Sequence, residues 1–375
     1  MFWGLLGAAT ALSVAYVTRP SYRKRPLPIV VPPLETSSEE VTHWVDLRLL
    51  KLAEHDVGFG VRFGVDAGST DIDETPEKTL TEQRERLYRR LAETQELSQD
   101  QLMQIVEIAE GSLYLGEGNP QVTVHPMTRA QCRKIRTENF VVKDDSKICG
   151  SKNMVALYDP MTQEPVQAKL CIDQFEFPNL PCEYPWVWVR ANEAAKICRI
   201  LDKRLCDAHE WEGACAGKVG APGKEYESWV GRMLAEYYHN QSRRWVWATG
   251  VVPDARLCAL GASKSPGCVD ATWEECGSNT YPNGAFPRCL SPFGVYDLHG
   301  NVAEHMNLPL EERQLGSHGG SGETEMKGSW FAFDEYHPHP HDCRWRAPAW
   351  HATPVDSELS HYNYHLGFRC CKDVE

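Results

Sequence analysis

The stretch that decides the fold is WVWVRANEAAKICRILDKRLCDAHEWEGACAG, residues 186–217. It predicts a helix from about residue 192 to 201, because its apolar residues recur at helical spacing. A second helix is expected to begin at Asp207, where the order Asp-Ala-His-Glu has the form of a capping box. Strand-like pieces at 169–175 and 186–189 lie among long irregular stretches rich in Trp, Gly, Pro and Cys. Two helices among short strands and long loops predict an α+β fold.

Length and composition exclude several classes of protein. The chain has 375 residues, of which 42% are hydrophobic and 24% charged, as in a globular protein of two or three domains. Lys and Arg total 39 and Asp and Glu total 52, which gives a formal net charge of −13. Such a chain is repelled by polyanions, so we expect no nucleic-acid partner.

The cysteines indicate the compartment. All fourteen lie at or after Cys132, and none of them forms the paired CxxC knuckles of a structural metal site. So many thiols without metal spacing are typical of disulfide-bonded proteins from oxidising compartments. We therefore expect an exported protein, periplasmic or extracellular.

The beginning of the chain has the character of a leader. Residues 2–17 are apolar and uncharged, and basic residues follow at 19–25. The length fits a signal peptide, but the position of the charges favours a retained anchor, so cleavage and membrane attachment both stay open. A proline-rich spacer follows, and we assign residues 1–35 to leader and spacer.

Two further domains are expected. Residues 36–131 are charged and helix-prone, with leucines near helical spacing and Ser98 placed to cap a second helix. No ligand cluster occurs there, so this small helical module is expected to serve for packing or dimerisation. Residues 132–375, which contain all the cysteines, form the other domain.

Three more motifs follow residues 186–217 in order: FGVYDLHGNVAEH at 293–305, MKGSW at 326–330 and LGFRCC at 366–371. Together the four blocks resemble the sulfatase-modifying-factor family, which includes the formylglycine-generating enzyme. The resemblance covers about residues 171–371. It implies a C-type-lectin-like core with little regular secondary structure, preceded here by the helical module.

The resemblance implies a calcium site in the turn of the second motif. Asp297 and Glu304 would supply carboxylates, and Gly300 and Val302 backbone carbonyls, which are the hard oxygen ligands that Ca²⁺ prefers. The alternative is a turn whose carboxylates only accept hydrogen bonds from backbone amides. A second calcium site of the family has lost its Asn side chain, because Ala259 stands there.

The family's catalytic residues are only partly present. Ser329 matches a serine beside the family's active site, and Cys343 matches its second copper-binding cysteine. Ala332 replaces the first of these cysteines, and Ala303 replaces a pocket tryptophan. Because two thiolates hold Cu(I) in this family, we do not expect standard formylglycine generation, and Ser329 and Cys343 are the catalytic candidates that remain.

A histidine-rich segment offers another metal site. His337, His339 and His341 alternate with other residues ahead of Cys343, and in an extended conformation the four side chains share one face. Imidazoles with one thiolate suit copper or iron. The alternative is an exposed loop whose histidines are solvated.

Disulfide pairings also follow from the resemblance. The family implies a bridge from Cys198 to Cys370. A second family bridge joins the position of Cys215 to the position now held by Ala347, and Cys343 is the natural replacement partner. A bridged Cys343 could not act as a thiolate ligand. The cysteines left near these positions, Cys206 and Cys371, form an additional candidate pair.

Two functions are therefore expected. In the first, the chain is an exported binding or structural module, stiffened by calcium, with an unknown peptide, protein or glycan as its ligand. In the second, it is an O₂-dependent copper or iron oxidase that acts on a peptide or small thiol. The state of Cys343 discriminates between them, since only the oxidase needs its thiolate.

Overall fold

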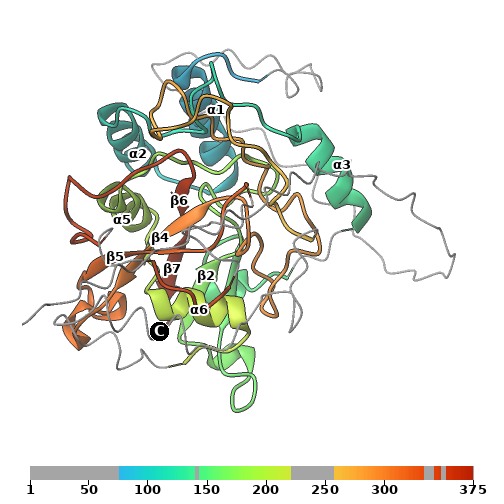
Figure 1. The fold of residues 1–375 in the computed structure, drawn as a ribbon. Coiled ribbons are helices and arrows are strands. Elements are labelled where there is room, and N and C mark those ends of the chain that lie inside the picture. The colour runs from blue at the N-terminus through green and yellow to red at the C-terminus, as the bar shows by residue number, and fades with distance from the viewer. Residues whose placement is uncertain (1–75, 140–142, 221–256, 333–341, 348–351, 375) are drawn as a thin grey trace, which may run out of the picture. The chain divides into compact units, whose positions relative to one another are not determined.

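The computed structural model describes residues 76–139, 143–220, 257–332, 342–347 and 352–374. All of them lie in one compact unit, Asp66–Glu375. The helices and strands of this unit, shown in Figure 1, are α1 (Leu80–Thr94), α2 (Gln99–Gly111), α3 (Arg129–Asn139), α4 (Ser146–Cys149), β1 (Met154–Leu157), β2 (Leu170–Asp173), α5 (Ala191–Ile200), β3 (Arg204–Leu205), α6 (Ala208–Ala216), β4 (Ala303–Leu308), β5 (Glu323–Lys327), β6 (Leu366–Phe368) and β7 (Cys370–Asp373). Single 3₁₀ turns occur at Pro165–Gln167, Glu312–Gln314 and Gly316–His318. Short helices and strands separated by long loops confirm the predicted α+β fold with little regular secondary structure.

Two small sheets organise the unit. The first has the order β1-β2-β7-β3, and each of its pairs is antiparallel. The second has the order β5-β4-β6, in which β4 is antiparallel to β5 and parallel to β6. Since β6 and β7 are separated by Arg369 alone, the segment 366–373 joins both sheets.

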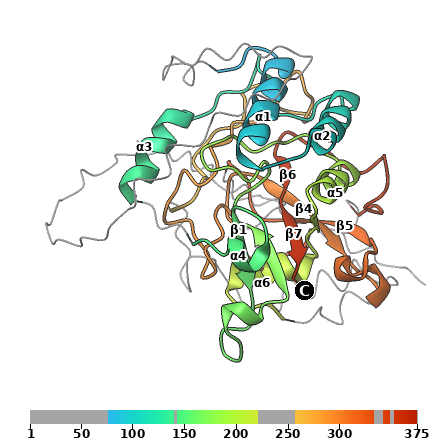
Figure 2. The same cartoon turned by 180° about the vertical axis from the view of Figure 1, so that it is seen from behind.

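Helices α1 and α2 belong to the main hydrophobic core. Each begins with a capping box, on Thr79 and on Ser98, and Ser98 is the cap that the sequence predicts. Their fully buried residues Leu91 and Ile105 lie in one cluster with Trp186 and with residues of α5, β6 and β7. Both views show α1, α2 and α5 together beside β6 (Figure 2). The predicted boundary between residues 131 and 132 therefore does not separate two cores.

A second core lies around α6. Trp211 of α6 is fully buried among residues of β1, β2 and β4. Helix α6 begins after Asp207, as predicted. The N–H of Asp207 donates to the Glu210 carboxylate at 2.8 Å, as in a capping box. Helix α5 also forms where the periodicity of residues 192–201 places it.

The prediction of a strand at 186–189 is wrong. Only Val187 pairs, in an isolated bridge with Gly116, and strand geometry ends at the next residue. Trp188 has φ +58°, in the left-handed region, which extended strands do not enter. The strand expected at 169–175 does form, as β2.

None of the helices in the described part of the chain is long and apolar enough to cross a membrane. The predicted leader and spacer at 1–35 lie outside the described residues, as does most of the segment 36–79.

Candidate functional site at the turn 297–304

The turn between Asp297 and Glu304 is built on unusual backbone geometry. Asp297, Gly300 and Asn301 all have positive φ, at 58°, 83° and 56°. A Cβ on Gly300 would stand 2.5 Å from the carbonyl oxygen of Ala259, so only glycine fits there. The carbonyl of Ala259 also accepts from the N–H of Asn301 at 2.9 Å. The turn is therefore held in one conformation against the loop that contains Ala259.

Glu304 is bound to Arg369. Its Oε2 accepts from Arg369 Nε at 2.6 Å and from Trp211 Nε1 at 3.1 Å, and its Oε1 accepts from Arg369 Nη2 at 2.7 Å. All three side chains are fully buried. A carboxylate has about four lone-pair sites, so one site on Oε1 is left for another partner.

Asp297 has more capacity for a ligand. Its Oδ2 accepts from the N–H of Gly284 at 2.6 Å, whereas its Oδ1 is buried and has no hydrogen-bond partner among the described residues. Burial raises the pKa of Asp297 to about 6, and the nearby Glu304 adds to this effect. A buried carboxylate oxygen without a partner is the kind of atom that a cation would stabilise.

A third buried carboxylate completes the cluster. Glu176 accepts from Asn301 Nδ2 at 2.6 Å and from the N–H of Val302 at 3.1 Å. Burial raises its pKa well above the usual range, and the charges of Asp297 and Glu304 raise it further. The site therefore carries an excess of buried acidic groups, for which Arg369 compensates only in part.

These contacts bear on the predicted calcium ligands. Asp297 fits a cation through Oδ1, and Glu304 fits it through one remaining site on Oε1. Gly300 and Val302 lie in the same turn, and their N–H groups are engaged with Ser329 Oγ and Glu176. Two buried carboxylates with remaining acceptor capacity therefore lie at this turn, and Glu304 would have to serve Arg369 and a cation together.

The two catalytic candidates, Ser329 and Cys343, both contact the turn 297–304. Ser329 follows β5, and its Oγ accepts from the N–H of Gly300 at 2.8 Å. Cys343 lies beside the preceding residue of the turn, with its Sγ 3.8 Å from His299 Nε2. Cys343 is, however, bonded to Cys215 of α6. In this oxidised state it provides no thiolate for a metal.

Other predictions for this region have mixed outcomes. His337, His339 and His341 lie outside the described residues. Ala332, at the position of the family's first copper cysteine, forms an isolated bridge with Gly261. The bridge at Cys343 weighs against a mixed imidazole and thiolate centre built on these histidines.

The disulfides extend well beyond the site. All fourteen cysteines are paired, including the pairs Cys198–Cys370 and Cys206–Cys371. Four bridges have no counterpart among the expectations from sequence: Cys132–Cys182, Cys149–Cys171, Cys258–Cys289 and Cys268–Cys276. Connectivity of this kind cannot be deduced from spacing alone. Seven disulfides are typical of a protein from an oxidising environment.

The structure contains an aromatic cluster centred on Trp188 that was not predicted from the sequence. The rings of Tyr114, Trp273 and Tyr362 lie 5.6, 5.4 and 6.0 Å from that of Trp188, and Tyr114 stacks on Trp273 at 4.8 Å. The indole Nε1 of Trp188 is buried without a hydrogen-bond partner in the described chain. The tryptophan-rich run at 186–188 was the one available signal, but its partners come from distant segments.

A groove adjoins this aromatic cluster. It has a volume of about 760 Å³ and is lined by residues of the segments 121–126, 261–267 and 274–279. Lys264, on its wall, lies with Nζ 5.2 Å from the ring centre of Trp330, which belongs to the same hydrophobic cluster as Trp188. The wall of the groove therefore contacts the hydrophobic cluster that contains Trp188.

Comparisons with known proteins identify the family. Residues 90–374 match the family described as sulfatase-modifying factor enzyme 1-like domain. Among curated proteins there is no match. A solved structure described as "Crystal Structure of CarF" is similar at 13% identity with a TM-score of 0.33, over 59% of this chain and 97% of that one. The family match begins inside α1 and runs through both sheets, and the chain therefore belongs to the sulfatase-modifying factor enzyme 1-like family.

Proposed function

We propose that this protein is an exported binding or structural module of its family and that it does not generate formylglycine in the standard way. The observation that carries the proposal is the Cys215–Cys343 bridge, together with Ala332 at the position of the other copper cysteine. The family's chemistry needs two thiolates to hold Cu(I), and neither position provides one.

The ligand is expected at the aromatic cluster. Trp188 has a strained backbone and a buried indole N–H without a partner in the described chain, and both are features of ligand-binding positions. Arg190 lies over the ring of Tyr362 at 4.0 Å. Trp, Tyr and Arg dominate the energetics of protein interfaces, which favours a peptide or protein over a glycan as the ligand.

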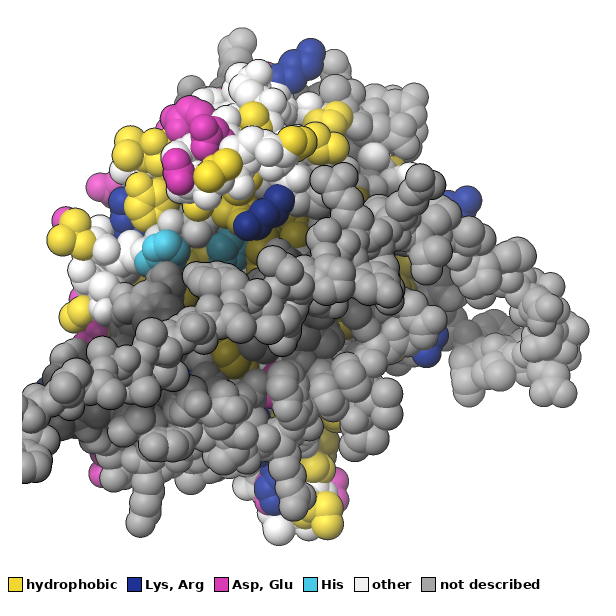
Figure 3. Space-filling model, viewed as in Figure 1, with side chains coloured by type: hydrophobic (Ala, Val, Ile, Leu, Met, Phe, Trp, Pro, Cys, Tyr) yellow, Lys and Arg dark blue, Asp and Glu magenta, His cyan; other side chains and the backbone are white. Residues whose placement is uncertain are grey.

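The described surface also carries apolar and charged side chains close together. In Figure 3, hydrophobic side chains lie beside histidine and basic side chains on the described part of one face. The neighbouring groove has a volume of about 760 Å³, and Lys264, Glu274 and Glu275 on its walls could pair with charges of either sign on a peptide.

Calcium is part of the proposal. Ca²⁺ would be held by Asp297 and Glu304 with the backbone carbonyls of Gly300 and Val302, and it would neutralise part of the buried acidic cluster. Its role would be to stiffen the turn against which Ser329 and Cys343 lie. The seven disulfides support export, and the apolar segment 2–17 would serve as signal peptide or membrane anchor.

Two experiments test the function. The oxidised full-length protein is incubated with cysteine-containing peptides, Cu(I), Ca²⁺ and O₂, and aldehyde formation is followed by trapping and mass spectrometry. We expect no aldehyde, and its appearance would overturn the proposal.

The second experiment screens peptide and glycan arrays with the same protein. We expect peptide binding that is lost in Trp273→Ala and retained in the control Val269→Ala, whose side chain is exposed on a neighbouring loop. Selective glycan binding would replace the peptide as the ligand class. Binding that is equally strong in Trp273→Ala would exclude the aromatic cluster as the site.

A further inference from the structure

His299 stands against both sulfurs of the Cys215–Cys343 disulfide. Its Nε2 lies 3.7 Å from Cys215 Sγ and 3.8 Å from Cys343 Sγ. The three residues come from α6, from the turn 297–304 and from the segment 342–347, and all are fully buried. Three ligand atoms from separate parts of the chain thus converge on one point.

Their spacing is close to that of a thiolate and imidazole metal site. Ligand atoms around a tetrahedral Zn²⁺, with Zn–S of about 2.3 Å and Zn–N of about 2.0 Å, lie roughly 3.5 to 3.8 Å from each other. The imidazole nitrogen already has this distance from both sulfurs. Only the two sulfurs would have to move apart, which happens when their bond is broken.

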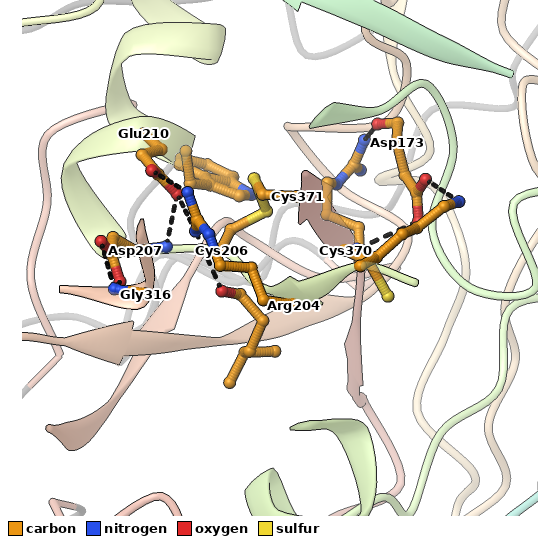
Figure 4. The surroundings of a disulfide bond; sticks show 12 residues. Asp173, Arg204, Cys206, Asp207, Glu210, Gly316, Cys370 and Cys371 are labelled. Atoms are coloured by element: carbon orange, nitrogen blue, oxygen red, sulfur yellow. Dashed lines mark hydrogen bonds and ion pairs between the residues drawn. A yellow bond between two sulfur atoms is a disulfide. The ribbon is translucent and has the colours of Figure 1, made fainter. Parts of the chain in front are cut away.

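In the described chain, two other groups of potential metal ligands lie close together, but their carboxylates already accept hydrogen bonds from other groups. The Cys206–Cys371 disulfide lies near Glu210, but the Glu210 carboxylate accepts from Arg204 Nη1 at 2.8 Å and from Nη2 at 2.6 Å. Figure 4 shows Arg204 reaching Glu210 beside this disulfide, and Asp207 directed toward Gly316. The third group, Asp207 with His209 and Glu210, shares these committed carboxylates.

We propose that Cys215, His299 and Cys343 form a metal site for a thiophilic ion, Zn²⁺ or Cu(I), when their disulfide is reduced. A dithiol reductant gives two electrons and two protons to the bridge, yielding two cysteine thiols and the oxidised cyclic disulfide of the reductant. When the ion binds, the two thiols release two protons, and His299 contributes the lone pair of Nε2.

Three protein ligands leave a fourth position of a tetrahedral ion open. Sites of this kind accept water or an exogenous thiol at that position. The same two cysteines would therefore act as a structural bridge under oxidising conditions and as a metal site under reducing conditions. This inference does not depend on ligand binding at the aromatic cluster, which takes no part in it. It does concern the same Cys215–Cys343 disulfide on which the proposed function rests.

The test uses the full chain and Co²⁺ as a spectroscopic substitute for Zn²⁺. The protein is treated with a dithiol under anaerobic, non-denaturing conditions, and the reduced cysteines are mapped by alkylation. We expect the reduced wild type to bind one Co²⁺ per chain with thiolate charge-transfer absorption, and the oxidised wild type to show none.

Matched variants assign the ligands. His299→Ala should weaken Co²⁺ binding by roughly tenfold or more, since even outer-shell partners of metal ligands are worth 10–100-fold. The double variant Cys215→Ala/Cys343→Ala should lose the charge-transfer band, and Cys206→Ala/Cys371→Ala should keep it. Unchanged binding in His299→Ala, or a band that depends on Cys206 and Cys371, would overturn the assignment.

Folding provides a second measurement. If reduction unfolds the protein, Zn²⁺ should restore the thermal transition of the reduced wild type but not that of reduced His299→Ala. A reduced wild type that neither binds Co²⁺ nor regains its transition with Zn²⁺ would refute the proposal.

Discussion

Arg369 donates to both carboxylate oxygens of Glu304, at 2.6 and 2.7 Å, and so joins the segment between β6 and β7 to the beginning of β4. The same guanidinium donates to the carbonyls of Asp173 and Tyr296, at 3.2 and 3.0 Å. One buried side chain therefore connects both sheets with the candidate site.

Breaking this ion pair should be costly. Arg369→Met leaves a buried Glu304 charge without its partner, and we expect a loss of about 3–5 kcal/mol in the free energy of unfolding. The control is Arg313→Met, because Arg313 and Glu311 form an exposed pair expected to be worth about 0–1 kcal/mol. Denaturant unfolding measures both changes. Similar losses in the two variants would contradict the role assigned to Arg369.

The shared core of α1, α2 and α5 predicts a single unfolding transition. Leu91→Ala removes a fully buried side chain of α1 and should cost about 2–5 kcal/mol, with the whole transition moving to lower temperature. Met103→Ala on α2 is the control, because Met103 is 53% exposed. Calorimetry would contradict the shared core if Leu91→Ala split the transition and shifted only a minor part of it.

Calcium should stabilise the protein through the turn 297–304. At a Ca²⁺ concentration 100 times the dissociation constant, binding to the folded state adds about 2.7 kcal/mol, which raises the Tm. Asp297→Asn should abolish this increase, because it removes the charge of the carboxylate whose Oδ1 has no described partner. Asp100→Asn, at an exposed position of α2, should retain it. A Tm that is insensitive to Ca²⁺ in the wild type would remove calcium from the proposed function.

His305 should make the stability depend on pH. Burial lowers the pKa of His305 to about 3, while its Nε2 lies 3.0 Å from the carbonyl of Val189. Between pH 6.5 and 3 the unfolded chain binds a proton at this residue and the folded chain does not, so stability falls as the pH falls. The loss from this group is about 1.4 kcal/mol per pH unit, and it is absent above pH 6.5.

The variant His305→Gln isolates this contribution. Between pH 7 and pH 5 its free energy of unfolding should fall by about 2 kcal/mol less than that of the wild type. His318→Gln, which changes an exposed residue, serves as the control. Parallel pH profiles for the wild type and His305→Gln would mean that His305 is not the source of the loss.

Local signals in the sequence predicted the elements that depend on local interactions. Helix α5 follows from apolar periodicity, and the caps at Ser98 and Asp207 follow from side chains that bond their own backbone three residues away. The resemblance to the family added the bridges of Cys198 and Cys343. In each case the deciding residues lie close together in sequence or in a recognisable motif.

The features that could not be predicted from the sequence depend on contacts between segments that are distant in the chain. The left-handed backbone of Trp188 is set by its tertiary surroundings, including the carbonyl of Asn363, which accepts from its N–H at 3.1 Å. The aromatic cluster draws on four separate segments. The Arg369–Glu304 pair also joins residues 65 positions apart, and no local pattern marks them as partners.

Strand β7 has a consequence for biosynthesis. It lies inside the first sheet, between β2 and β3, and its two cysteines bridge to partners 172 and 165 positions earlier in the chain. Neither β2 nor β3 can pair with β7 before residues 370–373 have been translated and released from the exit tunnel. Until then the nascent chain carries unpaired thiols and exposed strand edges, which makes it a client for chaperones and thiol oxidoreductases.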